Sequence, residues 1–478
     1  MLESLSAAYL YIPVILFILG WVKPIIAIPV VAALLYSLFV FKRNIHKGTT
    51  VSAPVTDRKY TVLIILILIG WVFISGVGGF VWQNTWDHKF RNALFNDLVA
   101  YPWPVINGDT GLCYYIGFWI PAALVGKLFS VEVGYFFQTI WASIGVILAV
   151  FLVFKYLGKQ KIGIVILFIF FSGLDVLLYV GKGIIAQRGL VTIVRSLLQG
   201  EHLELIARYF NSSSNTTLLF WLYNQIIPFW VGFMTILVQK KNKGVFFIYA
   251  TMFFFCPFPC ISLFPVILYI FLKNQVFCNG NNLSAYSAIK KLLSVENLVL
   301  LPTMLILALY YTSNIAVNKL GILPLGIPTI AFFLASFIVE FGVYLLFVYR
   351  ENKHDPILNI LLVTTVICSF IVMGNSYDFA WRTCIPLSFY IMLLVAKRLM
   401  NTSFPAVART CLLLLLLAGA FTPTTEFLRT ARMEHYVFTG LESARSDSLS
   451  TVFTRENNEC YENFIGDRNS HFFNHLCR

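Results

Sequence analysis

The stretch from Trp82 to Thr110 reads WQNTWDHKFRNALFNDLVAYPWPVINGDT and is the first long polar interruption in a mostly apolar chain. It follows an apolar run, Tyr60 to Val81, that is long enough to cross a membrane. Because lipid-exposed polar loops do not occur inside the hydrocarbon region, this stretch fixes where the preceding helix ends. Its ionisable residues are Asp87, His88, Lys89, Arg91, Asp97 and Asp109.

The composition indicates a membrane protein along the whole chain. Of its 478 residues, 59% are hydrophobic and 12% are charged, whereas soluble proteins carry about 25% charged residues. Apolar runs of about 20 residues recur, and each is long enough to cross a hydrocarbon core of ~30 Å as a helix. Pro24 between the first two runs, and Pro257 and Pro259 within the run Val245–Leu272, predict two helical hairpins, because proline breaks a helix. Barrel strands are instead ~10-residue segments of alternating polarity. We therefore predict an all-α fold, a polytopic bundle of transmembrane helices with interfacial helices in its extracytoplasmic loops.

Basic residues in the linkers predict the topology, because lysine and arginine collect in cytoplasmic loops. Counting apolar runs between these linkers gives about 13 net crossings, with the N-terminus inside and the C-terminus outside. Residues 1–421 then form the bundle, the loops 82–110, 181–215 and 374–383 lie outside, and residues 422–478 form an extracytoplasmic tail. The basic residues that mark the cytoplasmic side include Lys42, Arg43, Lys155, Lys159, Lys161, Lys240, Lys241, Arg350, Lys353, Lys397 and Arg398.

Two apolar segments, Leu112–Phe129 and Glu132–Phe154, lie where the topology allows only one net crossing. The first is short and contains Pro121. Irregular backbone at membrane depth is tolerated where protein or a water-filled cavity covers it. We therefore expect one of the two segments to be re-entrant or to lie flat.

The net charge of +13 does not indicate nucleic-acid binding, since no basic patch lies on a folded soluble domain. The positive charge instead follows the cytoplasmic linkers. The lipid bilayer is the partner that the composition predicts, and nucleic acid is not expected.

The first loop contains the candidate catalytic residues. Residues 87–98 have the pattern of a short amphipathic helix, on which Asp87 and Arg91 share a face. A carboxylate held at the dry membrane boundary can act as a general base or bind a divalent metal ion, the one cofactor that these acids suggest. Asp87 and Asp97 are the catalytic candidates, and local charge pairing is the alternative. His88, Arg91 and Trp103 are candidates for substrate binding; Trp103 suits sugar stacking, although interfacial anchoring is more common for tryptophan.

The second and third loops supply further candidates for substrate binding. His202 lies between Glu201 and Glu204, a possible acid–base or metal cluster without a known zinc spacing. Arg382, near the outer surface, could bind a lipid-linked phosphate, or it could pair with Asp378 four residues earlier. Two more basic residues of the second loop, Arg188 and Arg195, are also candidates for substrate binding. For this loop, a basic amphipathic segment that lies on the membrane surface is the alternative interpretation.

Glu340 is predicted to lie in the middle of a membrane helix, Pro328–Tyr349. An ionisable group at that depth is a candidate functional residue by default. Coupling of protons or ions through Glu340 would favour a transporter, whereas a neutral, hydrogen-bonded Glu340 would have a structural role.

An acidic first extracytoplasmic loop after an early membrane helix, many further helices and an outside tail resemble the GT-C class of polytopic glycosyltransferases. The phage-type O-antigen glycosyltransferases share a similar plan with a re-entrant segment. The resemblance implies a polyprenyl-phosphate sugar as the donor, with Asp87 where the catalytic acid of the loop stands and Asp97 where a second acid sometimes helps. The chain departs from that pattern by two extra apolar runs before the loop.

These features together predict an integral membrane glycosyltransferase of the bacterial cytoplasmic (inner) membrane. It would transfer a sugar from a polyprenyl-phosphate donor to a glycan or lipid acceptor of the cell envelope, on the extracytoplasmic side. The alternatives are a transporter or flippase of a lipid-linked or amphipathic solute, in which Glu340 matters more than Asp87, and a non-catalytic subunit of polysaccharide assembly. The outward placement of the acids favours the enzyme.

Overall fold

The fold of the protein is a bundle of α-helices, which confirms the predicted all-α polytopic class. Within the part of the chain that the structure describes, eight helices are long and apolar enough to cross a membrane, and four other apolar helices are shorter. The computed structural model describes residues 1–48, 58–79, 87–204, 209–242, 244–273, 298–318, 320–373, 377–432, 447–456 and 459–478. Parts of the predicted loops and tail, residues 82–86, 205–208, 374–376 and 433–446, therefore lie outside the described residues.

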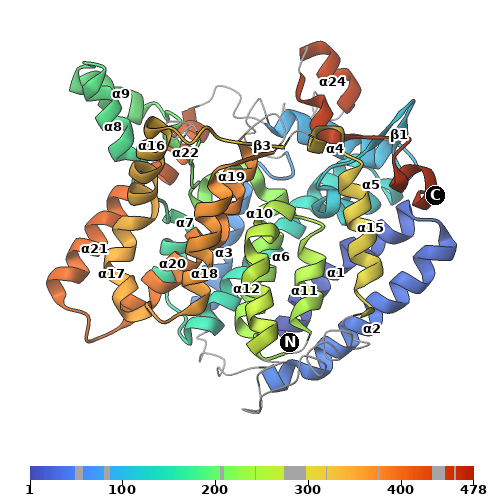
Figure 1. Cartoon of the computed structure of the whole chain (residues 1–478), viewed down its shortest axis with the longest axis horizontal. Coiled ribbons are helices and arrows are strands. Elements are labelled where there is room, and N and C mark those ends of the chain that lie inside the picture. Colours follow the sequence, from blue (N-terminus) through green and yellow to red (C-terminus); the bar gives the residue numbers. More distant parts are fainter. Residues whose placement is uncertain are drawn as a thin grey trace.

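The bundle has a polar end that gathers elements from distant parts of the sequence. Figure 1 shows the helices running roughly from top to bottom, with α4, α9, α24 and the strand β1 along the upper end. The N-terminus lies near the lower end of the bundle, whereas the C-terminus lies at the upper end (Figure 1). Helix α4 spans Asp87–Ala100, which confirms the helix predicted over residues 87–98.

The first two helices form the predicted hairpin. Helix α1 spans Leu2–Trp21 and α2 spans Pro24–Gly48. Proline is tolerated in the first turn of a helix because the backbone N–H groups there have no partner within the helix. Pro24 therefore starts α2 immediately after the turn. Helix α3, Arg58–Ile74, packs on α6.

The centre of the bundle is α10, Asn215–Val238, which packs against α6, Val131–Leu157, and α1. Of the most apolar 18-residue window of α10, 94% is buried. Helix α10 starts where the hydroxyl oxygen of Ser214 accepts the backbone N–H of Thr217 at 3.0 Å, a cap of the kind that stabilises a helix by about 1 kcal/mol. Because α10 is buried on all sides, the side chains at its N-terminus are held in fixed positions.

The sequence has two apolar segments, Leu112–Phe129 and Glu132–Phe154, where only one crossing is predicted. The first of them contains the short helix α5, Ile120–Leu128. Its nine residues extend ~14 Å at ~1.5 Å per residue, about half the ~30 Å needed to cross. Helix α6, with 27 residues, is long enough to span. Helix α5 packs between α4 and α6, so it belongs to the polar end of the bundle and does not add a crossing.

The remaining helices surround this centre. Helices α11 and α12 form the second predicted hairpin, interrupted before Pro257. Helix α22 continues after α21, so helical structure extends past the predicted boundary at residue 421. The bounds are α7 Ile162–Phe170, α8 Asp175–Ile185, α9 Leu190–Leu198, α11 Val245–Met252, α12 Pro257–Phe271, α15 Leu301–Thr312, α16 Ile327–Phe337, α17 Val343–Asn352, α18 Pro356–Ser369, α19 Asp378–Thr383, α20 Ile385–Met400, α21 Ala406–Gly419, α22 Phe421–Arg432 and α24 Leu449–Glu456. Single turns are η1 Ile116–Phe118, η4 Ile315–Asn318, the π turn η5 Ile338–Gly342, η6 Glu459–Phe464 and the π turn η7 Phe472–Leu476.

Two small antiparallel sheets connect separate segments of the chain at the polar end of the bundle. In the first sheet, β2, Thr110–Leu112, lies between β1, Ile106–Asn107, and β5, Ile465–Asp467. Its register pairs Gly111 with Gly466. The second sheet pairs β3, Leu320–Ile322, with β4, Ile371–Met373. The tail is therefore joined to the first loop by main-chain hydrogen bonds and is an integral part of the polar end.

Candidate functional site

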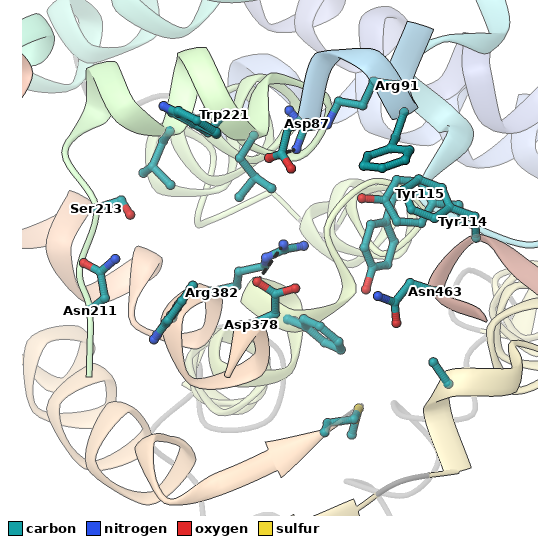
Figure 2. Close-up of a pocket in the computed structure, with 18 of the residues that line it drawn as sticks. Asp87, Arg91, Tyr114, Tyr115, Asn211, Ser213, Trp221, Asp378, Arg382 and Asn463 are labelled. Atoms are coloured by element: carbon teal, nitrogen blue, oxygen red, sulfur yellow. Dashed lines mark hydrogen bonds and ion pairs between the residues drawn. The ribbon is translucent and has the colours of Figure 1, made fainter. Parts of the chain in front are cut away.

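A cavity of about 620 Å³ lies at the polar end of the bundle. This volume falls within the range of small-molecule sites, ~300–1,000 Å³. Its walls come from α4, the segment after β2, the segment before α10, the N-terminal half of α10, α19 and the tail. Figure 2 shows the polar and aromatic side chains that point into it. They include Asp87, Arg91, Tyr114, Tyr115, Asn211, Ser213, Trp221, Asp378, Arg382 and Asn463.

Two Asp–Arg pairs of the same construction line this cavity. In α4, Arg91 Nη2 lies 3.0 Å from Asp87 Oδ2; in α19, Arg382 Nη2 lies 3.0 Å from Asp378 Oδ1. Each pair is spaced by four residues, which places both partners on one face of a helix. The local pairing considered for Arg91 and Arg382 is thus present in both helices. The side chains of Asp87 and Asp378 are 32% and 35% exposed, against 5% and 14% for their arginines, so the carboxylates are the more accessible members.

The electrostatic environment of Asp87 combines burial with three neighbouring charges. Burial raises the pKa of its carboxyl, the charge of Arg91 lowers it, Asp378 raises it, and Arg382 lowers it. The net pKa is above the ordinary value of 3.8. A carboxylate with a raised pKa is a stronger base, and a base is most efficient when its pKa approaches the working pH. Asp87 therefore has both the position and the basicity to accept a proton from a ligand.

The arginines of the cavity have capacity to bind an anion. The guanidinium carries five N–H donors, and Arg91 Nη1 is buried with no hydrogen-bond acceptor among the described residues. The carbon Cζ of Arg91 lies 5.4 Å from the ring centroid of Tyr223, which holds the side chain by a cation–π contact. A buried donor without a protein partner is an expected site for an oxygen of a bound ligand.

Aromatic rings form one wall of the cavity. Tyr114 stacks on Phe464 of the tail at 4.4 Å between ring centroids, and Tyr115 lies 5.8 Å from Tyr311. The amide of Asn314 fixes this wall by donating to the carbonyls of Cys113, at 2.8 Å, and of Asn463, at 3.0 Å. Flat, rigid rings with few polar atoms suit the apolar faces of a ring-shaped or lipid ligand.

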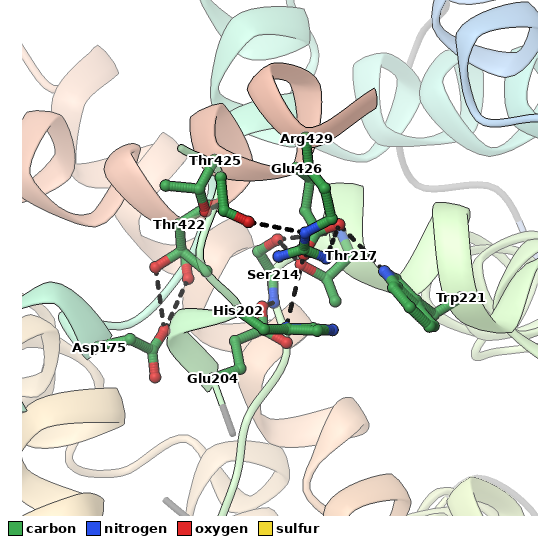
Figure 3. A network of polar contacts seen from close by, with 12 residues as sticks. Asp175, His202, Glu204, Ser214, Thr217, Trp221, Thr422, Thr425, Glu426 and Arg429 are labelled. Atoms are coloured by element: carbon green, nitrogen blue, oxygen red, sulfur yellow. Dashed lines mark hydrogen bonds and ion pairs between the residues drawn. The ribbon is translucent and has the colours of Figure 1, made fainter. Parts of the chain in front are cut away.

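A second polar network adjoins the cavity behind His202 and Trp221 (Figure 3). Trp221 Nε1 donates to Glu426 Oε2 at 3.0 Å, and Arg429 Nη1 donates to the same oxygen at 3.0 Å. His202 Nδ1 lies 3.7 Å from Glu426 Oε1. Burial and the charge of Arg429 lower the pKa of His202 to about 3. His202 is therefore neutral near pH 7, and its contact with Glu426 is not an ion pair.

Glu204 and Asp175 extend this network into the bundle. Glu204 Oε1 accepts the backbone N–H of Ser214 at 2.9 Å. Burial and then the nearby acids Asp175 and Glu426 raise the pKa of Glu204 to about 8. Asp175 Oδ2 accepts the hydroxyl of Thr422 at 3.2 Å. Glu204 therefore holds its proton to a higher pH than an exposed glutamate does.

Glu340 lies on the π turn η5 and is 3% exposed. Its carboxyl neighbours that of Asp175 and packs against Gly173. A Cβ added at Gly173 would lie 1.8 Å from Glu340 Oε2, so any larger residue there would displace the carboxyl. Single π turns in helices are frequent at functional sites.

Five of the predicted site residues line the cavity, and they come from three separate stretches of the sequence. Asp87 and Arg91 come from the first loop, His202 and Glu204 from the second, and Arg382 from the third. Only the predicted topology, which places the three loops on the same side of the membrane, indicated that they could meet.

Three predicted residues of the first loop have other contacts. Asp97 Oδ2 accepts the backbone N–H of Leu449 at the start of α24, at 3.1 Å. His88 is 1% exposed, its Nε2 lies 2.7 Å from the carbonyl oxygen of Phe220, and burial followed by the charge of Arg91 lowers its pKa to about 3. Trp103 packs on Trp21 at 5.0 Å and donates to the carbonyl of Leu98. All three lie outside the cavity, in the supporting structure.

The other predicted residues lie on or next to the arm formed by α8 and α9. Arg188, Arg195 and Glu201 are exposed and do not line the cavity. Figure 1 shows α8 and α9 at the edge of the upper end. Leu190 and Val191 on this arm are also exposed, at 69% and 76%. Exposed apolar and basic residues on one short helix are typical of a segment that lies on the membrane surface.

Sequence reasoning missed the aromatic wall and the contribution of the tail. Tyr114 and Tyr115 belong to Leu112–Phe129, one of the two apolar segments of which one is expected to be re-entrant or flat, and Asn463 lies in the tail, where the sequence indicates no site residue. The aromatic residues that begin at Tyr114, shortly after the polar loop, are the signal that was available. The set of missed residues is Tyr114, Tyr115, Asn211, Trp221, Asp378 and Asn463.

Within the described residues, no three histidine, cysteine, aspartate or glutamate side chains converge in a way that could hold a metal ion. The helices and the cavity define an integral membrane protein with a polar and aromatic cavity at one end of its bundle. Comparisons with protein-family models, with curated proteins and with solved structures gave no match.

Proposed function

We propose that the protein is a membrane glycosyltransferase that moves a sugar from a polyprenyl-phosphate donor to a glycan or lipid acceptor of the bacterial cell envelope. One observation carries this proposal: the cavity combines an accessible carboxylate of raised pKa, Asp87, with two arginines, the buried Arg91 and the partly buried Arg382. A base beside cations is the arrangement needed to activate a hydroxyl and to stabilise a departing phosphate. The aromatic wall would hold the sugar and the first part of the lipid.

The reaction is a single displacement. Asp87 takes the proton of an acceptor hydroxyl, and the hydroxyl oxygen forms a bond to the anomeric carbon of the sugar. The bond between that carbon and the phosphate oxygen breaks, and the polyprenyl phosphate leaves with the electron pair. Configuration at the anomeric carbon is inverted, and no covalent sugar–enzyme intermediate forms.

The leaving phosphate is bound by arginines. Arg382 and Arg91 take this role because both line the cavity, whereas Arg188 and Arg195, also considered from the sequence, are exposed outside it. Guanidinium groups bind phosphate oxygens with two parallel hydrogen bonds, which fixes the orientation of the donor. The pairs with Asp87 and Asp378 hold the arginines in place before the donor arrives.

We place the cavity on the extracytoplasmic side of the bacterial inner membrane, with the N-terminus inside and the C-terminus outside. The positive-inside rule supports this orientation, since the basic linkers mark the other side. An epitope inserted at the exposed turn Gly108–Asp109 is expected to bind antibody in intact spheroplasts. Binding only after the membrane is permeabilised contradicts the orientation.

Deletion of the gene followed by mass profiling of the surface polysaccharide tests the reaction. We expect the loss of one sugar unit from the glycan, its restoration by the wild-type gene, and no restoration by Asp87→Asn at an equal membrane level. Asp109→Asn is the matched control, because Asp109 is an exposed acid of the same loop outside the cavity and should restore the glycan. Full restoration by Asp87→Asn contradicts the proposal.

A transporter or flippase of a lipid-linked solute is the second candidate, and the buried Glu340 beside Asp175 favours it. In such a protein Glu340 would exchange protons or ions as the solute moves. Glu340→Gln keeps the size of the side chain and removes its charge. The enzyme predicts that this variant restores the glycan, whereas the transporter predicts that it does not and that the lipid-linked sugar accumulates unconsumed on the inner leaflet.

A further inference from the structure

A second cavity, of about 880 Å³, lies between α17 and α18. Its walls are apolar side chains of both helices, and its far end carries Tyr349, Arg350 and Lys353. Figure 1 shows α17 running downward from α16, so these three residues lie toward the end of the bundle opposite the polar end. The apolar residues of the groove include Phe337, Leu345, Leu346, Leu362, Val363 and Ile367.

The length of this groove matches one leaflet of a bilayer. From Gly342 to Lys353 the helix rises ~16 Å at ~1.5 Å per residue. The hydrocarbon core is ~30 Å thick, so each leaflet contributes ~15 Å. Leu346 and Val363 remain 81% and 59% exposed, as is expected where an acyl chain rather than protein covers them.

The charges at the end of the groove favour an anionic headgroup. Arg350 and Lys353 are exposed, and neither has an ion-pair partner among the described residues. The two neighbouring acids are already engaged: Glu351 pairs with Arg398, and Asp355 accepts the backbone N–H of Ile357 and the hydroxyl of Tyr390.

Tyr349 supports the same placement, because tyrosine prefers the level of the lipid headgroups. The groove thus has an apolar section one leaflet long, an aromatic residue at the interface and two unpaired cations beyond it. Basic pockets between transmembrane helices bind anionic headgroups such as that of cardiolipin.

We propose that this groove is a binding site for one anionic glycerophospholipid. An acyl chain lies along α17 and α18, and the phosphate binds Arg350 and Lys353. A zwitterionic lipid gains less there, because its own amine offsets the attraction of its phosphate. The site lies apart from the cavity and does not depend on the proposed sugar transfer.

Native mass spectrometry of the full chain, released from nanodiscs of phosphatidylcholine with a minor fraction of phosphatidylglycerol, tests this site. The wild type should retain one phosphatidylglycerol more than its variant R350Q/K353Q. Each cation near the membrane surface contributes about 1 kcal/mol, so removal of both should weaken retention about 30-fold. The matched control is K159Q/K161Q, which removes two exposed basic residues of another linker and should retain the lipid.

A third variant separates the groove from the charges. Val363→Trp fills the apolar section and should reduce retention although both cations remain. Equal retention by R350Q/K353Q and the wild type overturns the proposal, as does equal retention of phosphatidylcholine. If undecaprenyl phosphate, added at the same fraction, displaces phosphatidylglycerol, the choice of occupant is wrong.

Discussion

Two groups of acids at the polar end of this protein are built in different ways. In the cavity, Asp87 and Asp378 are each paired with an arginine four residues later, and about a third of each carboxylate side chain stays accessible. In the adjoining network, Asp175, Glu204 and Glu340 come from three separate segments and are at least 97% buried. The first group can meet a ligand and exchange a proton with it, whereas in the second group only Glu204 borders the cavity, and Asp175 and Glu340 are enclosed by protein.

This difference explains why burial alone is a poor guide to function. A buried acid in a membrane protein is a functional candidate by default, and on that criterion Glu340 ranks above Asp87. Two other criteria favour Asp87 instead. Its carboxylate lines a cavity, and it lies beside a cation that can bind an anionic ligand.

Asp87→Asn should reduce sugar transfer about 10²- to 10⁴-fold, the usual contribution of a general base. The amide keeps the shape of the side chain but cannot accept the proton. The measurement is transfer of labelled sugar in isolated membranes, with protein levels matched by immunoblot. A loss of less than twofold would assign proton transfer to another group.

Arg382→Lys should reduce transfer about 10- to 100-fold, since a hydrogen bond to a charged group contributes about 1.5–3 kcal/mol. Lysine keeps the charge but cannot bind phosphate through two parallel N–H groups. The loss should appear in the dependence of the rate on donor concentration. Arg188→Lys, at an exposed position outside the cavity, serves as the control and should leave the rate unchanged.

The pH dependence of transfer should move in opposite directions in two variants. Activity requires deprotonated Asp87, so it falls as pH falls through the pKa of that carboxyl. Arg91 lowers this pKa and Asp378 raises it. Arg91→Gln should therefore shift the acidic limb of the rate profile to higher pH, and Asp378→Asn should shift it to lower pH. A shift in the same direction in both variants contradicts the assignment of the limb to Asp87.

Asp97→Ala should lower the free energy of unfolding by about 1 kcal/mol, because it removes the acceptor of the Leu449 N–H at the start of α24. The expected reduction in transfer is far smaller than for Asp87→Asn. Thermal unfolding in detergent provides the measurement, with Asp97→Asn, which keeps an acceptor oxygen, as the control. Complete loss of transfer at normal stability would return Asp97 to the catalytic candidates.

The sequence predicted the parts of this molecule that depend on local pattern. Apolar runs and Pro24 predicted the helices and the first hairpin, and the four-residue spacing of Asp87 and Arg91 predicted that they share one face of α4. The contribution of Tyr114 or Asn463 to the cavity could not be predicted in this way. It depends on Asn314 joining the first loop to the tail, a contact between distant segments that leaves no periodic signal.

The contacts of Asp97 show the same limit. Its carboxylate has the composition of an active-site acid, and burial raises its pKa to about 6. Its partner is a backbone N–H more than 300 positions later in the chain. Whether an acid meets a ligand or a helix end is decided by packing, which the residue type does not reveal.

The pairing of β2 with β5 has a consequence for biosynthesis. Leu112 pairs with Ile465, and the carbonyl of Trp21 accepts the backbone N–H of Arg478, so these early residues gain their partners only once residues 465–478 have been translated. A ribosome-bound chain can insert its preceding helices in order and still lack Phe464 in the aromatic wall. The cavity is therefore completed only after translation has passed that segment.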